Sequence, residues 1–196
     1  MIPLSKPITP SEIAFDIDGV VADTMEAFLN VAKNDFGIDH LRKDHITSYW
    51  LEDCLPIPAE TVYAIIDRLV EDPFGTSLMP ISGAREALLP LASRFPVTFV
   101  TARPSGGPIT QWLHSILPDI PCDSLNVIAT GKHALKADVL KELGVSYFVE
   151  DHLETCEALF AQGIGAIVFD QPWNRARTPY MRVSSWQEIV SMMDLN

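Results

Sequence analysis

Two carboxylates at the end of an apolar run constrain this chain more than any other feature of its sequence. Residues 12–15 indicate a short strand, and Asp16 and Asp18 follow it closely, with Gly19 next. Because residues two apart in a strand point to the same face, the two carboxylates leave the strand close together, where they repel and raise each other's pKa. Such a pair is unfavourable unless a cation or a chemical reaction compensates it, so we expect an active site or a metal site here.

Short apolar strands alternate with helices along the rest of the chain. The spacing of apolar residues predicts helices over 24–36, 58–70, 83–93, around Trp112 and Ile116, over 134–143 and over 153–161. It predicts strands over 97–100, 125–128, 147–149 and 166–169, the last being the final clear strand. Short apolar strands separated by helices predict an α/β fold, a Rossmann-like parallel sheet with helices on both faces.

The segment between the first strand and the second is helical in character. A helix follows Pro58, and no strand is recognisable between about residues 38 and 80. We therefore predict a core domain made of residues 1–23 and 80–196, with residues 24–79 inserted as a small helical unit. Asp23 and Glu26 resemble a capping pair for the first helix, and we favour that role for Asp23 over metal ligation.

Composition narrows the classes of partner. The 196 residues carry a net charge of −12, which argues against a nucleic-acid polymer and leaves any anionic substrate dependent on local cations. No apolar run reaches the roughly 20 residues that a membrane span needs, and residues 1–10 make a poor secretory signal. Three widely spaced cysteines fit reduced thiols. We therefore expect a cytoplasmic protein without a membrane partner, in an oligomeric state that the sequence leaves open.

Polar side chains also end two later strands. Thr101 follows the strand at 97–100, and Glu150 and Asp151 follow the strand at 147–149. Ligands of open parallel sheets bind beyond the carboxyl ends of the strands. These three side chains are therefore expected to meet Asp16 and Asp18 in one crevice.

The ordered set of motifs resembles the haloacid dehalogenase superfamily in its phosphohydrolase branch. Four motifs carry the resemblance over most of the chain: Asp16-Ile17-Asp18-Gly19-Val20, Thr101 within residues 99–104, a lysine before the helix at 137–143, and Glu150-Asp151. The resemblance implies a Mg²⁺-dependent phosphomonoesterase that works through an aspartyl-phosphate, with residues 24–79 as a cap. A calcium-binding loop and a P-loop are excluded, because the glycines and ligands that each requires are missing.

The resemblance also implies roles for the motif residues. Asp16 would be the nucleophile, Asp18 the general acid and then the general base, and Thr101 a hydrogen-bonding partner of the phosphoryl group. Mg²⁺ would be held by Asp16, the backbone carbonyl of Asp18 and Asp151, with Glu150 nearby or bound through water.

The family's lysine would neutralise the nucleophile and the phosphate. Its distance from the glycine that ends its helix favours Lys136, and Lys132 is the alternative. Lys132 and Arg103 are also predicted to bind the substrate, although a surface position fits Arg103 equally well. His152 is expected to start a helix rather than to bind a metal.

Looser motifs resemble the 5′(3′)-deoxyribonucleotidase-like branch of the superfamily. They lie at residues 46–50, 101–104, 171–174 and 182–186. The implied substrate is a small phosphorylated metabolite, with a nucleoside monophosphate as the specific candidate. Tyr49, Trp50 and Trp173 are candidates for stacking on a base, although packing is the commoner use of buried aromatic rings.

Three other functions fit the same fold. A 2-haloacid dehalogenase does not need a second acid, so Asp18 argues against it. A phosphomutase or phosphotransferase would pass the phosphoryl group to another alcohol, and the sequence does not separate it from a hydrolase. A non-catalytic binding protein is disfavoured because all four motifs are intact.

Overall fold

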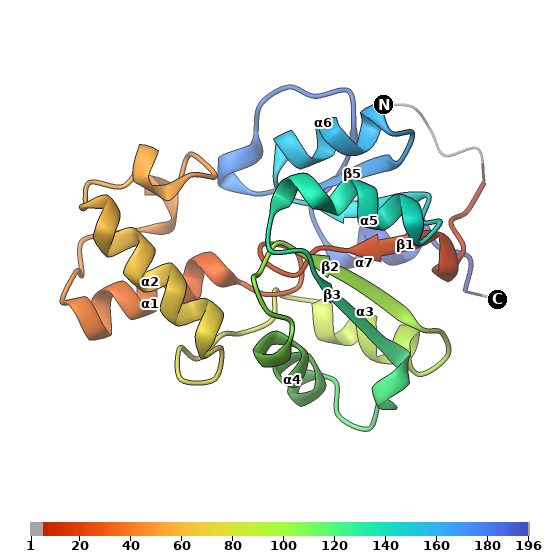
Figure 1. Ribbon diagram of the computed structural model, residues 1–196, viewed down its shortest axis with the longest axis horizontal. Helices are drawn as coiled ribbons and strands as arrows, with labels where there is room; N and C mark the ends of the chain where they lie inside the picture. Colours follow the sequence, from red (N-terminus) through yellow and green to blue (C-terminus); the bar gives the residue numbers. More distant parts are fainter. Residues whose placement is uncertain (1–5, 196) are drawn as a thin grey trace.

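A computed structural model of the protein describes residues 6–195 and contains a six-stranded parallel sheet (Figure 1). The strands lie in the order β3-β2-β1-β4-β5-β6. Their bounds are Ile13–Phe15 (β1), Val97–Thr101 (β2), Leu125–Ala129 (β3), Tyr147–Glu150 (β4), Gly165–Phe169 (β5) and Met181–Val183 (β6). Residues 1–5 and Asn196 lie outside the described part. The first residues of the predicted core domain, and of the segment 1–10 that was considered as a secretory signal, therefore also lie outside it.

Helices cover both faces of this sheet, which confirms the predicted α/β class. Their bounds are Thr24–Phe36 (α1), Ala59–Glu71 (α2), Ala84–Ala92 (α3), Gly107–Ile116 (α4), Lys136–Glu142 (α5), Leu153–Ala161 (α6) and Trp186–Ser191 (α7). Alternate residues of β1 serve opposite faces, as the period of a strand requires. Ile13 and Phe15 pack in the same cluster as residues of α3, α4 and α7, whereas Ala14 packs with residues of α5 and α6.

The strand order contains a topological switch point beside β1. β1 pairs with β2 on one side and with β4 on the other, both in parallel. The carboxyl ends of β1, β2 and β4 are therefore adjacent, and the chain order reverses direction across the sheet at this point. Open α/β sheets bind ligands at such a switch point.

The strands and helices predicted from periodicity are present, with small shifts at their ends. The prediction that 166–169 is the last clear strand is wrong, because β6 adds a parallel edge strand beside β5. β6 has only three residues and Arg182 lies at its centre, so it has no apolar run to detect. α7 was also not predicted, since it has only six residues.

Asp23 caps α1, as predicted. Its side chain accepts a hydrogen bond from the backbone N–H of Glu26 at 3.2 Å, and Lys43 pairs with the same carboxylate at 2.9 Å. Gly37 ends the helix in the left-handed conformation. The carboxylate of Asp23 is thus engaged by the helix and by a lysine.

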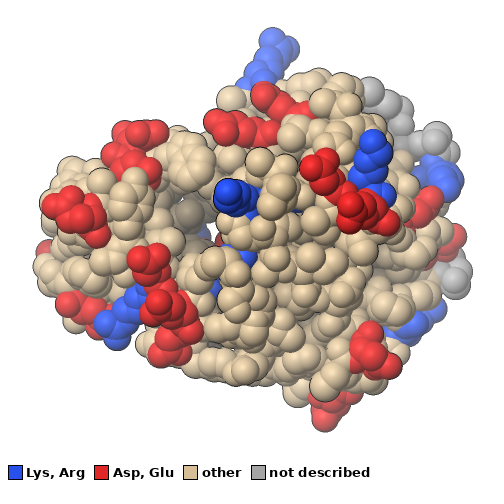
Figure 2. Space-filling model, viewed as in Figure 1, with Lys and Arg blue, Asp and Glu red and all other residues tan. Residues whose placement is uncertain are grey.

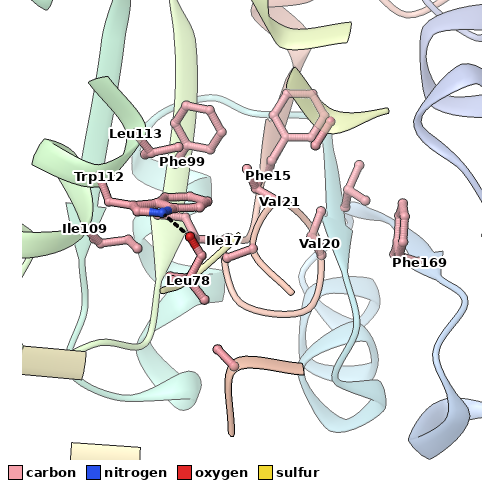
Figure 3. Close-up of a cluster of buried hydrophobic side chains, with 14 of the residues drawn as sticks. Phe15, Ile17, Val20, Val21, Leu78, Phe99, Ile109, Trp112, Leu113 and Phe169 are labelled. Carbon is pink, nitrogen blue, oxygen red and sulfur yellow. Dashed lines mark hydrogen bonds between the residues drawn. The ribbon is translucent and has the colours of Figure 1, made fainter. Parts of the chain in front are cut away.

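The helices α1 and α2 pack against each other in a lobe beside the sheet core (Figure 1). The chain leaves the core and returns to it at neighbouring points, where the backbone N–H of Asp23 donates to the carbonyl of Met79 at 2.9 Å. The Trp112 indole N–H donates to the carbonyl of Leu78 at 2.8 Å and fixes the returning segment on α4 (Figure 3). The apolar residues of the turn after β1, Ile17, Val20 and Val21, are buried in the same cluster and fix this turn on the core.

Two expectations from composition can be compared with this fold. Across residues 6–195, no helix is both long enough and apolar enough to cross a membrane. Cys54, Cys122 and Cys156 all carry free thiols.

Candidate active site

Asp16 lies directly after β1 and is held by a buried lysine. Its Oδ2 is 2.6 Å from Nζ of Lys136, which is the first residue of α5 and is fully buried. The same ammonium lies 2.9 Å from Oε2 of Glu150. Burial and the charge of Glu150 raise the pKa of Asp16 well above its usual range, although Lys136 opposes the shift. The structure therefore brings Lys136 to the predicted nucleophile, whereas Lys132 is exposed and lies outside the cavity described below.

Glu150 is engaged through both of its oxygens. Oε2 binds Lys136, and Oε1 accepts from the backbone N–H groups of Asp151 and His152 at 3.0 and 3.1 Å. Burial would raise the pKa of Glu150, but the Lys136 ammonium outweighs it and the pKa lies at about 2. Glu150 thus remains a carboxylate and fixes the turn that carries Asp151.

Asp151 has one oxygen with a partner and one without. Oδ2 accepts from the indole N–H of Trp173 at 3.0 Å, whereas Oδ1 is buried and has no hydrogen-bond partner among the described residues. Burial and the charge of Glu150 raise the pKa of Asp151 well above its usual range. A buried orphan carboxylate oxygen is unfavourable on its own, so this atom is suited to a ligand that carries positive charge.

Three buried carboxylates gather at this point of the sheet edge. Oxygen atoms of Asp16, Glu150 and Asp151 lie within 4.8 Å of one another. Lys136 supplies only one positive charge against them, so the cluster keeps an excess of negative charge. An oxygen-only donor set with this excess could hold a hard divalent cation.

Gly19 allows Asp151 to approach the turn after β1. Its φ is +73°, in the left-handed region, and a Cβ at this position would overlap Oδ2 of Asp151. The carbonyl of Gly19 accepts from the side-chain amide of Gln171 at 2.7 Å. Both the backbone conformation and the close contact therefore require glycine here.

We expect Gly19→Ala to affect metal binding as well as stability. The left-handed backbone alone should cost about 1–2 kcal/mol, and displacement of Asp151 should weaken divalent-cation affinity by about tenfold or more. Gly37→Ala is a matched control, because Gly37 has φ +68° but open space around its Cβ. Thermal unfolding with and without Mg²⁺ measures both effects. Equal losses of metal-dependent stabilisation in the two variants would contradict this role for Gly19.

Asp18 points into the same site but is paired with an arginine. Arg103 donates to both of its oxygens, from Nε at 2.9 Å and from Nη2 at 2.8 Å, and the Thr24 hydroxyl donates to Oδ1 at 2.6 Å. Burial would raise the pKa of Asp18, but the guanidinium outweighs it and the pKa lies below its usual range. Arg103 is only 4% exposed, so the surface position considered for it is wrong.

Thr101 ends β2 next to these residues. It is buried, its Oγ1 accepts from the backbone N–H of Arg103 at 3.3 Å, and its carbonyl accepts from the backbone N–H of Thr130 at 2.8 Å. Within residues 6–195 the Thr101 hydroxyl donates no hydrogen bond, so its hydrogen can donate into the site.

A cavity of about 380 Å³ opens from this edge toward the α1–α2 lobe. Its wall includes Asp16, Asp18, Thr101 and Arg103 on the core side, and Phe28, Tyr49, Trp50, Ile66, Leu69 and Val70 on the lobe side. In the space-filling view the molecule is hollowed between the two lobes, and Asp and Glu side chains are scattered widely over the visible face (Figure 2). Long-range attraction therefore does not favour an anionic ligand, and the cations inside must provide its binding.

Two aromatic contacts near the cavity could not be predicted from the sequence. The ring of Tyr49 stacks on that of His152 with centroids 3.9 Å apart, and the Tyr49 hydroxyl lies 3.3 Å from Nε2 of His133. His152 does start α6, as predicted, and it also forms this stack. Trp173 is buried against Asp151 and does not line the cavity, so its position fits packing rather than base stacking.

Known proteins share both the sequence pattern and the fold. A family model described as 5′ nucleotidase, deoxy (pyrimidine), cytosolic type C protein matches residues 10–196. Over 184 residues the chain is 26% identical to a 5′(3′)-deoxyribonucleotidase of Bacillus subtilis (strain 168), and the match covers 90% of this chain and 95% of that protein.

Solved structures that resemble this chain share its fold but have been given different activities. A HAD-superfamily hydrolase of subfamily IA from Geobacter sulfurreducens has a TM-score of 0.59 at 20% identity, covering 97% of this chain and 98% of that one. A 2-haloacid dehalogenase from Pseudomonas syringae has a TM-score of 0.50 at 13% identity, covering 92% and 96%. Because hydrolases of both names share this architecture, the residues of the site must decide the reaction.

Proposed function

The chain belongs to the family of 5′ nucleotidase, deoxy (pyrimidine), cytosolic type C proteins, and from that premise we propose that it is a Mg²⁺-dependent nucleoside monophosphatase. It is a hydrolase of phosphoric monoesters. The substrate class, the metal and the roles of individual residues are the content of the proposal.

The observation that carries the proposal is the pairing of Asp16 with Lys136. The 2.6 Å contact joins a buried carboxylate to a buried ammonium at the carboxyl end of the central strand. A lysine here offsets the charge of an incoming phosphate and contacts only Oδ2 of Asp16. Oδ1 accepts one hydrogen bond, from the backbone N–H of Ile17 at 2.7 Å, and keeps a lone pair for attack. This supports Asp16 as the nucleophile and Lys136, rather than Lys132, as the lysine of the site.

We propose that Mg²⁺ is held by Asp16, the backbone carbonyl of Asp18 and Asp151. The orphan Oδ1 of Asp151 and the oxygen-only donor set fit this ion. Both oxygens of Glu150 already have partners, so we assign it to holding Lys136 and the Asp151 turn rather than to direct ligation. When bound, the ion would neutralise phosphate charge that grows in the transition state.

The proposed reaction has two steps, both performed by this chain's carboxylates. Asp16 attacks the phosphorus atom and the bond from phosphorus to the ester oxygen breaks. Asp18, which is a carboxylate while it pairs with Arg103, takes up a proton from water when that pair opens and gives this proton to the leaving alcohol. Water then attacks the phosphorus of the aspartyl-phosphate, Asp18 takes a proton from it, and inorganic phosphate leaves with Asp16 restored. Thr101 donates a hydrogen bond to a phosphoryl oxygen in both steps.

The cavity supports a nucleotide as the substrate. Its phosphate end is polar, and its lobe side carries Tyr49 and Trp50, whose rings offer a surface for a nucleobase. We propose that residues 24–79 form the cap that selects this substrate. The free thiols fit a reducing compartment such as the cytoplasm.

Hydrolysis of p-nitrophenyl phosphate with and without Mg²⁺ tests the proposed reaction. We expect turnover that EDTA abolishes and Mg²⁺ restores, followed by higher kcat/KM on at least one nucleoside monophosphate than on sugar phosphates. Lack of metal-dependent turnover would overturn the reaction, and failure on every nucleotide would overturn the substrate class. Release of chloride from a 2-chloroacid would favour the dehalogenase, and transfer of phosphate to added alcohols would favour the phosphotransferase.

A further inference from the structure

Arg103 connects Asp18 to the α1–α2 lobe through a buried guanidinium. Nε and Nη2 donate to Asp18, and Nη1 donates to the carbonyls of Leu69 and Val70 at 3.1 and 3.3 Å, near the C-terminal end of α2. The arginine is 4% exposed, and it lines the cavity. A single side chain from the loop after β2 thus contacts both lobes beside the place where a phosphate would bind.

This pairing opposes the task proposed for Asp18. Oδ1 accepts from Arg103 and Thr24, and Oδ2 accepts from Arg103, so the guanidinium engages both oxygens of Asp18, although 27% of the side chain is exposed. Delivery of a proton to a leaving alcohol requires an oxygen of Asp18 that faces the substrate. The ion pair therefore has to open during the reaction.

Opening the pair leaves a buried guanidinium that needs another anion. An unpaired buried charge is strongly unfavourable, so the event that frees Asp18 must also supply a new partner to Arg103. The phosphoryl group of a monoester is such a partner, because a guanidinium binds phosphate in the same two-pronged geometry as it binds a carboxylate. Arg103 and Asp18 line the same cavity, so the exchange needs only a local movement.

We propose, on the basis of the proposed phosphatase function, that Arg103 exchanges Asp18 for the phosphoryl group when substrate binds. In the free enzyme Arg103 holds the acid in place. In the complex the guanidinium binds the phosphoryl group, and Asp18 is released toward the leaving oxygen. Asp18 and the phosphate thus compete for one arginine.

Competition makes a distinctive prediction for binding of inorganic phosphate, measured by titration calorimetry with saturating Mg²⁺. Asp18→Asn frees Arg103, so we expect it to bind phosphate about tenfold more tightly than the wild type does. Arg103→Gln should bind it about tenfold more weakly, and the double variant should match Arg103→Gln within about twofold. Asp170→Asn is the matched control, because it frees Arg182 from an ion pair of 2.9 Å outside the cavity, and its phosphate affinity should not change.

If the effects of Asp18→Asn and Arg103→Gln on phosphate affinity were additive in the double variant, the exchange would be overturned. Removal of the Asp18 charge would then raise phosphate affinity with or without Arg103. Unchanged affinity in Arg103→Gln would also overturn it. If Arg103→Gln does not fold, Arg103→Lys replaces it in the same comparison of single and double variants, because lysine keeps a cation beside Asp18. We then expect Asp18→Asn to raise phosphate affinity less in the Arg103→Lys background than in the wild-type background. Hydrolysis of p-nitrophenyl phosphate by the wild type separates the failure of the exchange from the failure of the proposed phosphatase function. Activity together with additive variant effects would reject the exchange alone, and absence of activity would reject both.

Discussion

Asp16→Asn is expected to lower kcat for aryl phosphate hydrolysis by about 10³-fold or more, because removal of a covalent nucleophile leaves only the binding groups of the site. The amide has nearly the shape of the carboxylate, so the cavity and the contact with Lys136 should persist. Single-turnover kinetics should show no acid-stable, base-labile phosphate on the variant, whereas the wild type should trap a phosphorylated Asp16. A variant that keeps more than about a tenth of wild-type kcat would contradict the role of Asp16 as nucleophile.

The same substitution should not destabilise the fold. Burial and repulsion by Glu150 and Asp18 raise the pKa of Asp16 and so already disfavour its charged form. The neutral amide removes that repulsion, while Lys136 retains Glu150 as its partner. We therefore expect a Tm without Mg²⁺ equal to or above that of the wild type, together with a smaller rise in Tm on addition of Mg²⁺. Loss of activity with a large fall in Tm would indicate misfolding and would not test the nucleophile.

The sheet edge could be predicted because each of its parts is a local pattern. Short apolar runs between helices identify the central strands, and the polar residue after each run must lie at the carboxyl edge of a parallel sheet. Asp16, Thr101 and Asp151 therefore come together without any knowledge of distant contacts. Lys136 is favoured over Lys132 only through the family resemblance, which implies a lysine at that distance from the glycine that ends the helix.

Contacts between remote segments could not be predicted in this way. Arg103 is 85 residues from Asp18, and nothing near it in sequence distinguishes a buried ion pair from a surface arginine. Trp173 was recognised as an aromatic residue in a family-like motif, but its bond to Asp151 depends on the loop after β5 folding over the end of β4. The edge strand β6 escaped prediction for a different reason, because three residues with an arginine at the centre carry almost no periodic signal.

Lys136→Met is expected to have a large effect on both stability and turnover. It removes the only positive charge that contacts Asp16 and Glu150 within the described residues, so two buried carboxylates lose their common partner. Breaking a buried ion pair from one side costs about 3–5 kcal/mol, and loss of a charged group that contacts the phosphoryl oxygens should lower kcat by about 10²–10³-fold. Lys132→Met is the matched control; its exposed side chain should leave stability within about 0.5 kcal/mol.

The double variant Lys136→Met/Glu150→Gln separates the structural loss from the catalytic one. Glutamine removes the uncompensated charge of residue 150, while its carbonyl oxygen can still accept from the backbone N–H groups of Asp151 and His152. The free energy of unfolding, measured with urea, should therefore recover part of the loss seen in Lys136→Met. Turnover should not recover, because neither substitution supplies a cation beside Asp16. Recovery of kcat together with stability would mean that Lys136 acts only by holding the fold, and a larger loss of turnover in Lys132→Met would assign the catalytic cation to Lys132 instead.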